Sequence, residues 1–158
     1  MDITFKTSEG RFNHRACAVI IHDEKLLVMK DRRSPYFYLP GGRVLFHETA
    51  ESAVLREVRE ELGIAASIIR PLWMVQSFFT EDVTGEQFHE LCLYCLVDVT
   101  NTELLSRGGV FPGAEGEKGQ QFTWLPFERV EREYLYPMFI KKRIRDLPEQ
   151  LTLLTEKE

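Results

Sequence analysis

Short apolar runs alternate with polar turns along most of the chain. Val and Ile dominate residues 16–21, Leu and Val dominate residues 26–29, and polar residues separate the two runs. This pattern predicts two strands joined by a tight turn. Residues 66–79 and 88–100 are rich in β-branched and aromatic residues and predict two longer strands, the first interrupted at Pro71. Residues 120–127 predict another short strand.

One segment follows a helical period instead. Four apolar residues recur on one face of residues 49–62 and would dock a helix against a sheet: Val54, Leu55, Val58 and Leu62. Thr49 is suited to cap the first turn of this helix, and Gly63 to end it. A second, closing helix is predicted over residues 137–145.

Strands and helices mixed in this order predict a single α/β domain with a mixed sheet. A length of 158 residues suits one domain. We assign residues 1–13 to a loosely held lead-in, residues 14–148 to the domain and residues 149–158 to a C-terminal tail. Residues 101–119, rich in glycine and polar residues, predict a long loop, and loops of that length are often functional.

The charge balance narrows the range of partners. Twenty-five acidic against 20 basic residues give a net charge of −5, which argues against general binding to nucleic-acid polymers or anionic membranes. No apolar run approaches the roughly 18 residues of a membrane helix. The first 15 residues contain no apolar signal core, so we expect a cytoplasmic protein.

Two of the three cysteines, Cys92 and Cys95, form a C-x-x-C pair. Residues three apart on a strand point to opposite faces, so a shared metal or a redox pair is disfavoured here. We interpret them as two separate cysteines packed as small apolar residues.

Three acids in the first predicted helix, Glu57, Glu60 and Glu61, lie on one face beside the apolar stripe. Like charges at this spacing repel each other, and partial burial would increase the cost. Mg²⁺ prefers oxygen ligands and keeps several waters, so a half-shell of carboxylates on one helix suits it. The alternative interpretation is an ordinary solvated acidic face.

The residues before this helix favour the metal site. Gly42 is followed after five residues by Glu48, and after seven more by Arg56-Glu57-Val58-x-Glu60-Glu61-x-Gly63-Ile64. This 23-residue stretch matches the Nudix box at every defined position. The sequence therefore resembles the Nudix hydrolase superfamily of MutT-like pyrophosphohydrolases.

The resemblance implies an α/β/α sandwich around a mixed sheet. It also implies that water attacks the diphosphate of a nucleoside diphosphate linked to another group, with Mg²⁺ or sometimes Mn²⁺ as cofactor. By position, the implied metal ligands are Glu57, Glu60, Glu61 and the carbonyl of Gly41. Glu48 is similar to an outer-shell acid, and Arg56 to the residue that orients the cluster.

Two alternatives from the same superfamily stay open. A non-catalytic nucleotide-sensing domain would share the fold, although such domains usually lose box acids that this chain keeps. An isopentenyl diphosphate isomerase would need a catalytic cysteine, for which Cys17 and the strand cysteines give no clear match. A homodimer is also possible, because many relatives of this superfamily dimerise.

The general base and the substrate contacts are less defined. In the family the base is a box glutamate, here Glu57, or an acid from a later loop. Glu117 is our loop candidate, with Glu115 beside it; a solvated role for either is the alternative. Residues that could hold extra phosphate charge are Lys30, Arg32, Arg33 and Arg43. Aromatic residues that could stack on a base, or simply pack in the core, are Tyr36, Phe37, Tyr38, Phe78 and Phe79.

Overall fold

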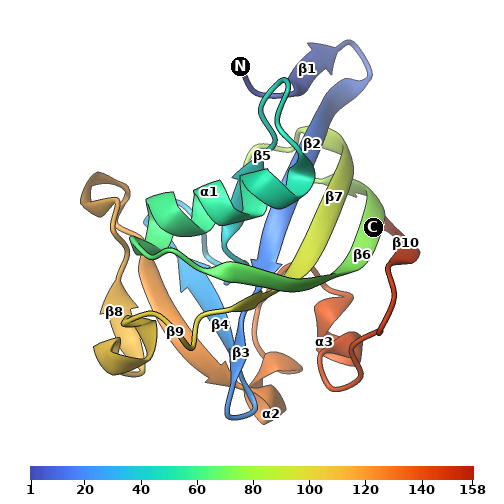
Figure 1. Ribbon diagram of the computed structural model, residues 1–158. Helices are drawn as coiled ribbons and strands as arrows, with labels where there is room; N and C mark the ends of the chain where they lie inside the picture. Colours follow the sequence, from blue (N-terminus) through green and yellow to red (C-terminus); the bar gives the residue numbers. More distant parts are fainter.

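A mixed sheet of six strands forms the centre of the computed structural model, which describes residues 1–158 (Figure 1). Its strands are β1 (Thr4–Thr7), β2 (Gly10–Val19), β5 (Gly41–Arg43), β6 (Ser67–Thr80), β7 (Gln87–Asp98) and β10 (Thr152–Lys157). The order is β1-β2-β7-β6-β10, and β5 pairs with β2. The pairs β2–β7 and β6–β10 are parallel and the others antiparallel, which confirms the predicted mixed sheet.

A second sheet adjoins the first and is antiparallel throughout. Its order is β3-β4-β9-β8, made from β3 (Ile21–His22), β4 (Lys25–Lys30), β9 (Gln121–Pro126) and β8 (Val110–Pro112). The turn between β3 and β4 places Asp23 and Glu24 at positive φ, as a tight turn of two residues requires. The predicted strand pair at residues 16–29 is thus confirmed.

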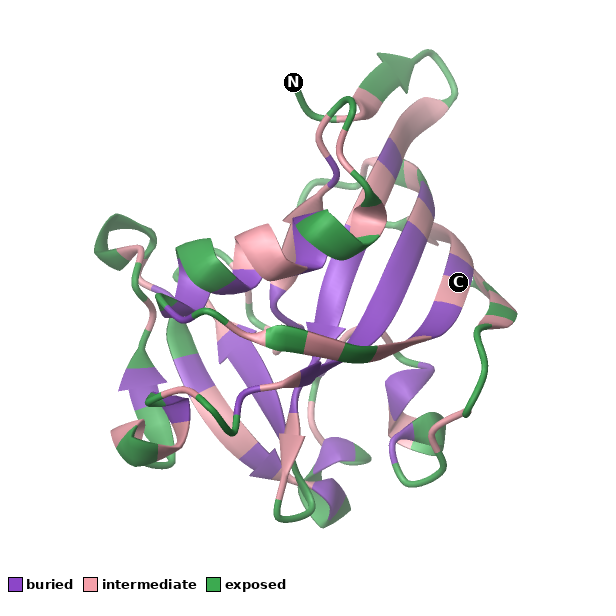
Figure 2. Cartoon of the chain, viewed as in Figure 1, coloured by how far each residue is buried: buried purple, intermediate pink, exposed green.

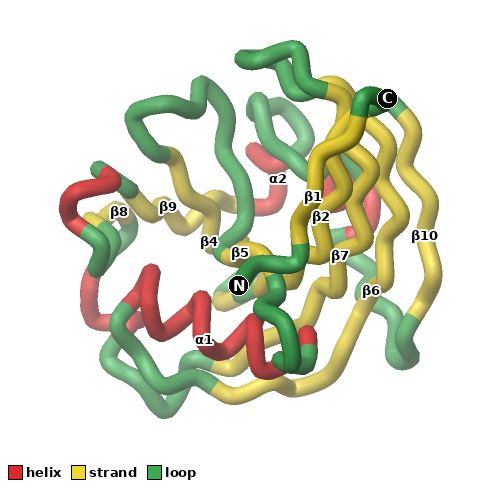
Figure 3. Tube along the Cα trace, turned by 90° about the horizontal axis from the view of Figure 1, so that it is seen from above, coloured by secondary structure: helices red, strands yellow, loops and turns green.

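Helices cover both faces of the six-stranded sheet (Figures 1 and 3). They are α1 (Ala50–Leu62), α2 (Phe127–Val130) and α3 (Ile140–Arg143). The alternation of side chains along β2 divides the core in two, and Figure 2 shows the central strands as largely buried. Ala16 and Ala18 pack with Val54 and Val58 of α1, whereas Cys17 and Val19 pack on the side of α2 and α3. The result is the predicted α/β/α arrangement.

Helix α1 begins and ends as its sequence predicts. The Thr49 hydroxyl accepts a hydrogen bond from the Ser52 N–H, and Gly63 adopts a left-handed conformation with φ 68°. Val54, Val58 and Leu62 are fully buried, so the apolar stripe fixes which way the acids of this helix face.

Four sequence predictions need correction. Residues 4–7 and 10–13, predicted as a loose lead-in, form the β1–β2 hairpin, in which every residue from Thr4 to Thr7 pairs with one from Gly10 to Asn13. The predicted tail supplies β10. The predicted loop 101–119 contains two 3₁₀ turns, Leu104–Arg107 and Gly116–Lys118, and β8, whose buried Phe111 stacks on Phe122. The closing helix is one short turn, α3, within residues 137–145.

The cysteines are all free and buried. Cys92 belongs to the core below α2 and α3, and Cys95 to the core below α1, as the strand alternation predicts. The unexpected neighbour is Cys17, whose Sγ lies 3.6 Å from the Cys92 Sγ. No helix in the chain is both long enough and apolar enough to span a membrane.

Candidate active site

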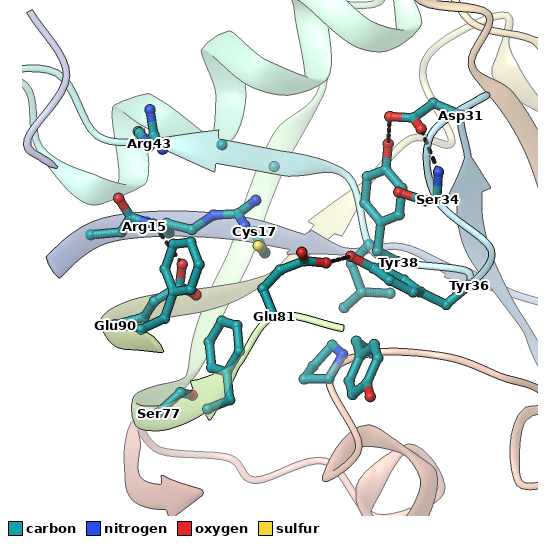
Figure 4. Close-up of a pocket in the computed structure, with 18 of the residues that line it drawn as sticks. Arg15, Cys17, Asp31, Ser34, Tyr36, Tyr38, Arg43, Ser77, Glu81 and Glu90 are labelled. Atoms are coloured by element: carbon teal, nitrogen blue, oxygen red, sulfur yellow. Dashed lines mark hydrogen bonds between the residues drawn. The ribbon is translucent and has the colours of Figure 1, made fainter. Parts of the chain in front are cut away.

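A cavity of about 610 Å³ opens where β2, β5, α1 and the β6–β7 hairpin meet (Figure 4). The segment between β4 and β5, the loop before β9, residues 136–138 and the last residues of the chain also contribute to its wall. Its charged lining residues include Arg15, Arg33, Arg43, Glu57, Glu61, Glu81, Glu90, Glu115 and Lys118. A nucleotide-sized ligand fits within this volume, since small-molecule sites usually span about 300–1,000 Å³.

Two glycines bring the acids of α1 against the cavity. A Cβ on Gly42 would lie 2.3 Å from Oε1 of Glu57, and a Cβ on Gly41 would lie 2.7 Å from Sγ of Cys17. Any larger residue in β5 would therefore push the helix or the thiol away. The Gly41 N–H donates to Oε1 of Glu61 at 2.9 Å, which fixes that carboxylate beside the β5 backbone.

Burial and mutual repulsion disfavour negative charge on both cavity-facing acids of α1. Burial raises the pKa of Glu57, although the contacts with Arg56 act in the opposite direction. Burial and then the charge of Glu57 raise the pKa of Glu61 to about 9. A cation bound between Glu57 and Glu61 would offset this cost and favour the charged form of both carboxylates.

Arg56 holds the helix to the segment that precedes it. Its Nε and Nη2 donate to the two oxygens of Glu48 at 2.7 and 2.9 Å, and Nη2 also donates to the carbonyl of Arg43 at 3.0 Å. Its Nη1 donates to Oε1 of Glu57 at 2.8 Å and to Oε2 of Glu60 at 3.4 Å. The hydrogen bonds from Arg56, ahead of other causes, lower the pKa of Glu48. These contacts suit the positioning roles that the sequence suggests for Glu48 and Arg56.

The third box acid differs from the other two. The Glu60 side chain is 47% exposed, against 15% for Glu57, and Glu60 does not line the cavity. No three His, Cys, Asp or Glu side chains in the chain converge into a preformed metal cage. The donor set nevertheless fits a hard cation that keeps several waters: two carboxylates have raised pKa values, and the two glycines of β5 beside them carry no Cβ.

The loop before β9 contributes two residues to the site, Glu115 and Gln120, and nothing in the sequence pattern indicated Gln120. Glu115 lines the cavity and pairs with Lys118 at 3.1 Å, whereas Glu117 is exposed and does not line it. Gln120 is buried and donates from Nε2 to Oε2 of Glu61 at 3.4 Å, while its own Oε1 has no partner. The free Oε1 of Gln120 can accept a hydrogen bond from water or coordinate a metal ion.

The predicted substrate-binding residues separate into two groups. Arg33, Arg43 and Phe79 line the cavity, and the Phe79 ring stacks on Phe88 with centroids 5.1 Å apart. Arg32 lies outside it against Gly119, and Lys30 lies over the Phe37 ring at 4.4 Å. Tyr36 and Tyr38 also line the cavity, and their hydroxyls donate to Glu81 and Asp31 (Figure 4).

Two further residues of the cavity wall, Arg15 and Glu90, escaped the sequence analysis. Both lie in strands that the sequence predicts as buried, where a charged residue on the inward face is unusual. Strand alternation was the available signal: Arg15 shares a face with Cys17, two residues later. Which face of the sheet carries a cavity depends on the tertiary fold.

Comparison with known proteins assigns the family. A family model described as NUDIX domain matches residues 12–147, most of the chain. The chain belongs to the NUDIX family. Among curated NUDIX-related proteins, the ADP-ribose pyrophosphatase of Methanocaldococcus jannaschii is 37% identical over 97 residues, which cover 58% of this chain and 55% of that protein. The chain spans about half the length of the curated relatives it matches.

Solved structures agree with the NUDIX fold. The mutator MutT protein of Bacillus halodurans aligns with a TM-score of 0.61 at 13% identity, covering 91% of this chain and 89% of that one. An ADP-ribose pyrophosphatase of Streptococcus suis aligns with a TM-score of 0.55 at 13% identity, covering 90% and 98%. At these identities the likeness concerns the fold alone, and it confirms the α/β class with a mixed sheet.

Proposed function

We propose that this NUDIX protein is a Mg²⁺-dependent pyrophosphohydrolase that acts on a nucleoside diphosphate linked to another group. The observation that carries the proposal is the approach of Glu57 and Glu61 to a nucleotide-sized cavity past Gly41 and Gly42 of β5. The similarity to an ADP-ribose pyrophosphatase supports the same class of substrate. Mn²⁺, which also prefers oxygen ligands, would serve as a substitute.

In this proposal Glu57, Glu60, Glu61 and the Gly41 carbonyl hold the metal. The bound ion would neutralise the phosphate oxygens and lower the pKa of the attacking water. Glu60 sits outside the cavity wall, so it would contribute from the rim. Arg56, fixed by Glu48, keeps the Glu57 carboxylate turned toward the cavity.

Glu57 is also our choice for the general base. The water oxygen bonds to phosphorus, the bond from that phosphorus to the bridging oxygen breaks, and the second phosphate leaves with the bridging oxygen. Glu57 takes the proton of the water; burial raises the pKa of this carboxyl, which makes it a better base near neutral pH. Glu117 stays the alternative from the later loop, and Glu115 lies closer to the cavity.

The remaining cavity wall would hold the rest of the substrate. Arg33 and Arg43 would bind phosphate oxygens at the rim, and the Phe79–Phe88 stack offers a ring face to a base. We also propose a cytoplasmic location, as the sequence leads us to expect.

The test is a substrate screen with product identification. ADP-ribose, nucleoside diphosphate sugars and nucleoside triphosphates would be incubated with the enzyme in Mg²⁺, in Mn²⁺ and in excess chelator. We expect turnover of at least one diphosphate-linked nucleotide, with ¹⁸O from labelled water entering a phosphate product. Glu61→Gln should abolish it, whereas the surface variant Glu128→Gln should not. Tight binding of these nucleotides without any product would contradict the proposal and favour a sensing domain.

A further inference from the structure

Arg15 lines the cavity, and its guanidinium has no hydrogen-bonding or ion-pairing partner in the protein. Its Nε is buried and donates to no acceptor, and no carboxylate forms an ion pair with its guanidinium. The other basic residues of the wall differ: Arg43 pairs with Asp2, Lys118 pairs with Glu115, and Arg33 is exposed to solvent. Arg15 alone combines burial with unused donors.

This arrangement is costly unless something else accepts from the guanidinium. Arginine carries five N–H donors and stays charged, and a buried donor left without an acceptor destabilises the fold. Glu90, also buried, is close enough to stabilise the positive charge, but its Oε2 accepts a hydrogen bond from Nδ2 of Asn13 at 2.8 Å. Glu90 thus balances the charge of Arg15 without satisfying its donors.

Arg15 lies on the same face of β2 as Cys17, the face away from α1, and lines the cavity that Glu57 and Glu61 also line. Its neighbours across β2 are Arg43 in β5 and Cys92 in β7. Figure 4 shows the guanidinium extended along β2 beneath β5, toward Cys17. Cys17 is the residue against which Gly41 packs, and Gly41 holds Glu61. Burial is the main influence on the pKa of both Glu57 and Glu61, but the charge of Arg15 also reaches both.

We propose that Arg15 binds non-bridging oxygens of the substrate's diphosphate from the sheet side of the cavity, opposite the α1 carboxylates. This inference rests on the proposed function and adds a residue to it. A guanidinium presents parallel N–H donors that match two oxygens of a phosphate, so a diphosphate would satisfy the donors that the protein leaves free. The metal-binding acids and Arg15 would then hold the diphosphate between them.

Binding of a non-hydrolysable probe tests this separately from turnover. Calorimetry would measure the affinity for α,β-methylene-ADP in saturating Mg²⁺, with adenosine as a probe that lacks phosphate. We expect Arg15→Gln to weaken α,β-methylene-ADP binding by about 10- to 100-fold, the range for lost hydrogen bonds to a charged group. Arg15→Lys should recover part of the loss. Affinity for adenosine, and both affinities in the surface variant Arg132→Gln, should not change.

Two readouts separate a binding role from a structural one. A purely structural arginine, when replaced, would weaken binding of adenosine as well as of α,β-methylene-ADP. A diphosphate contact leaves adenosine affinity unchanged, even where loss of the charge that balances Glu90 lowers the melting temperature of Arg15→Gln. Guanidinium ion at millimolar concentration should restore probe binding to Arg15→Ala and have no effect on Arg132→Gln. Unchanged probe affinity in Arg15→Gln, or a loss that adenosine shares and guanidinium does not rescue, would overturn the inference.

The outcomes for the two proposals differ. If the wild-type protein binds the probe through Arg15 but hydrolyses no nucleotide, the proposed hydrolase function fails and the diphosphate contact stands. If the protein hydrolyses nucleotides and Arg15→Gln retains full probe affinity, the hydrolase function stands and the contact is wrong. Absence of probe binding in the wild-type protein would also overturn the contact.

Discussion

Arg56 donates two hydrogen bonds, of 2.7 and 2.9 Å, to the carboxylate of Glu48, eight residues earlier in the sequence. The pair ties the segment after β5 to the middle of α1, and the free end of the same guanidinium reaches Glu57. Glu48 also accepts from the Leu45 N–H at 3.0 Å. Through Arg56, the Glu48 carboxylate therefore determines the orientation of the Glu57 carboxylate.

Replacing Glu48 with Gln should reduce both stability and catalysis. The neutral amide cannot accept two charged hydrogen bonds, so we expect the free energy of unfolding to fall by about 1–3 kcal/mol. Arg56, released from Glu48, would compete with the metal ion for the Glu57 carboxylate. We therefore expect kcat to fall by roughly 10-fold or more. Urea unfolding and steady-state kinetics measure the two effects. Glu128→Gln, an exposed and unpaired acid, is the control, and equal behaviour of both variants would refute the positioning role.

The stability of the metal-free protein should depend on pH through Glu61. Burial raises the pKa of this carboxyl to about 9 from an ordinary value of 4.5, so the folded state prefers the protonated form. Its contribution to stability is complete below pH 4.5 and is lost as the pH rises through 9.

Glu61→Gln mimics the protonated form and should therefore be more stable than wild type at pH 8, in chelator, but not at pH 4.5. Melting scans would show a gap that widens with pH by roughly 2–4 °C per kcal/mol of difference. Saturating Mg²⁺ should close the gap by stabilising wild type alone. A gap that is independent of pH would mean that the Glu61 carboxyl is not strained in the metal-free fold.

Gly42→Ala should damage the site far more than the fold. The added Cβ would meet the Glu57 carboxylate at 2.3 Å, at the end of a side chain that can rotate away. We expect kcat to fall about 100-fold or more and the melting temperature to change little. Gly109→Ala is the matched control, because nothing lies within 4 Å of its Cβ. Retention of full Mn²⁺ affinity and activity in Gly42→Ala would show that this close approach is dispensable.

The two candidates for the general base, Glu57 and Glu117, can be distinguished by replacing each with Gln. If Glu57 is the base, Glu57→Gln should lower kcat by about 10³-fold, while Glu117→Gln should remain within a factor of about two. The pH–rate profile of Glu117→Gln should then keep its acidic limb. Loss of that limb in Glu117→Gln would move the role to the loop before β9.

Local chemistry explains which features the sequence could predict. Residue spacing and capping preferences within a few turns predict α1, its Thr49 cap and its acidic face. The spacing from Gly42 locates the segment, β5, that lies against Glu57 of this helix. Arg15 and Gln120 could not be found in this way. Their significance depends on which strand face lies over the cavity and on contacts between segments far apart in sequence. The β1–β2 hairpin and β8 were missed because short, exposed strands are stabilised by their partners rather than by their own residues.

The parallel pairing of β2 with β7 also has a consequence for folding. Arg15 meets Cys92 only when two segments from opposite halves of the chain join, and such distant contacts form slowly because the entropy of loop closure must be lost first. The β6–β7 hairpin can form locally, but the cavity floor cannot. The residues that line the cavity run from Asp2 to Glu158, so ligand binding reports completion of the fold.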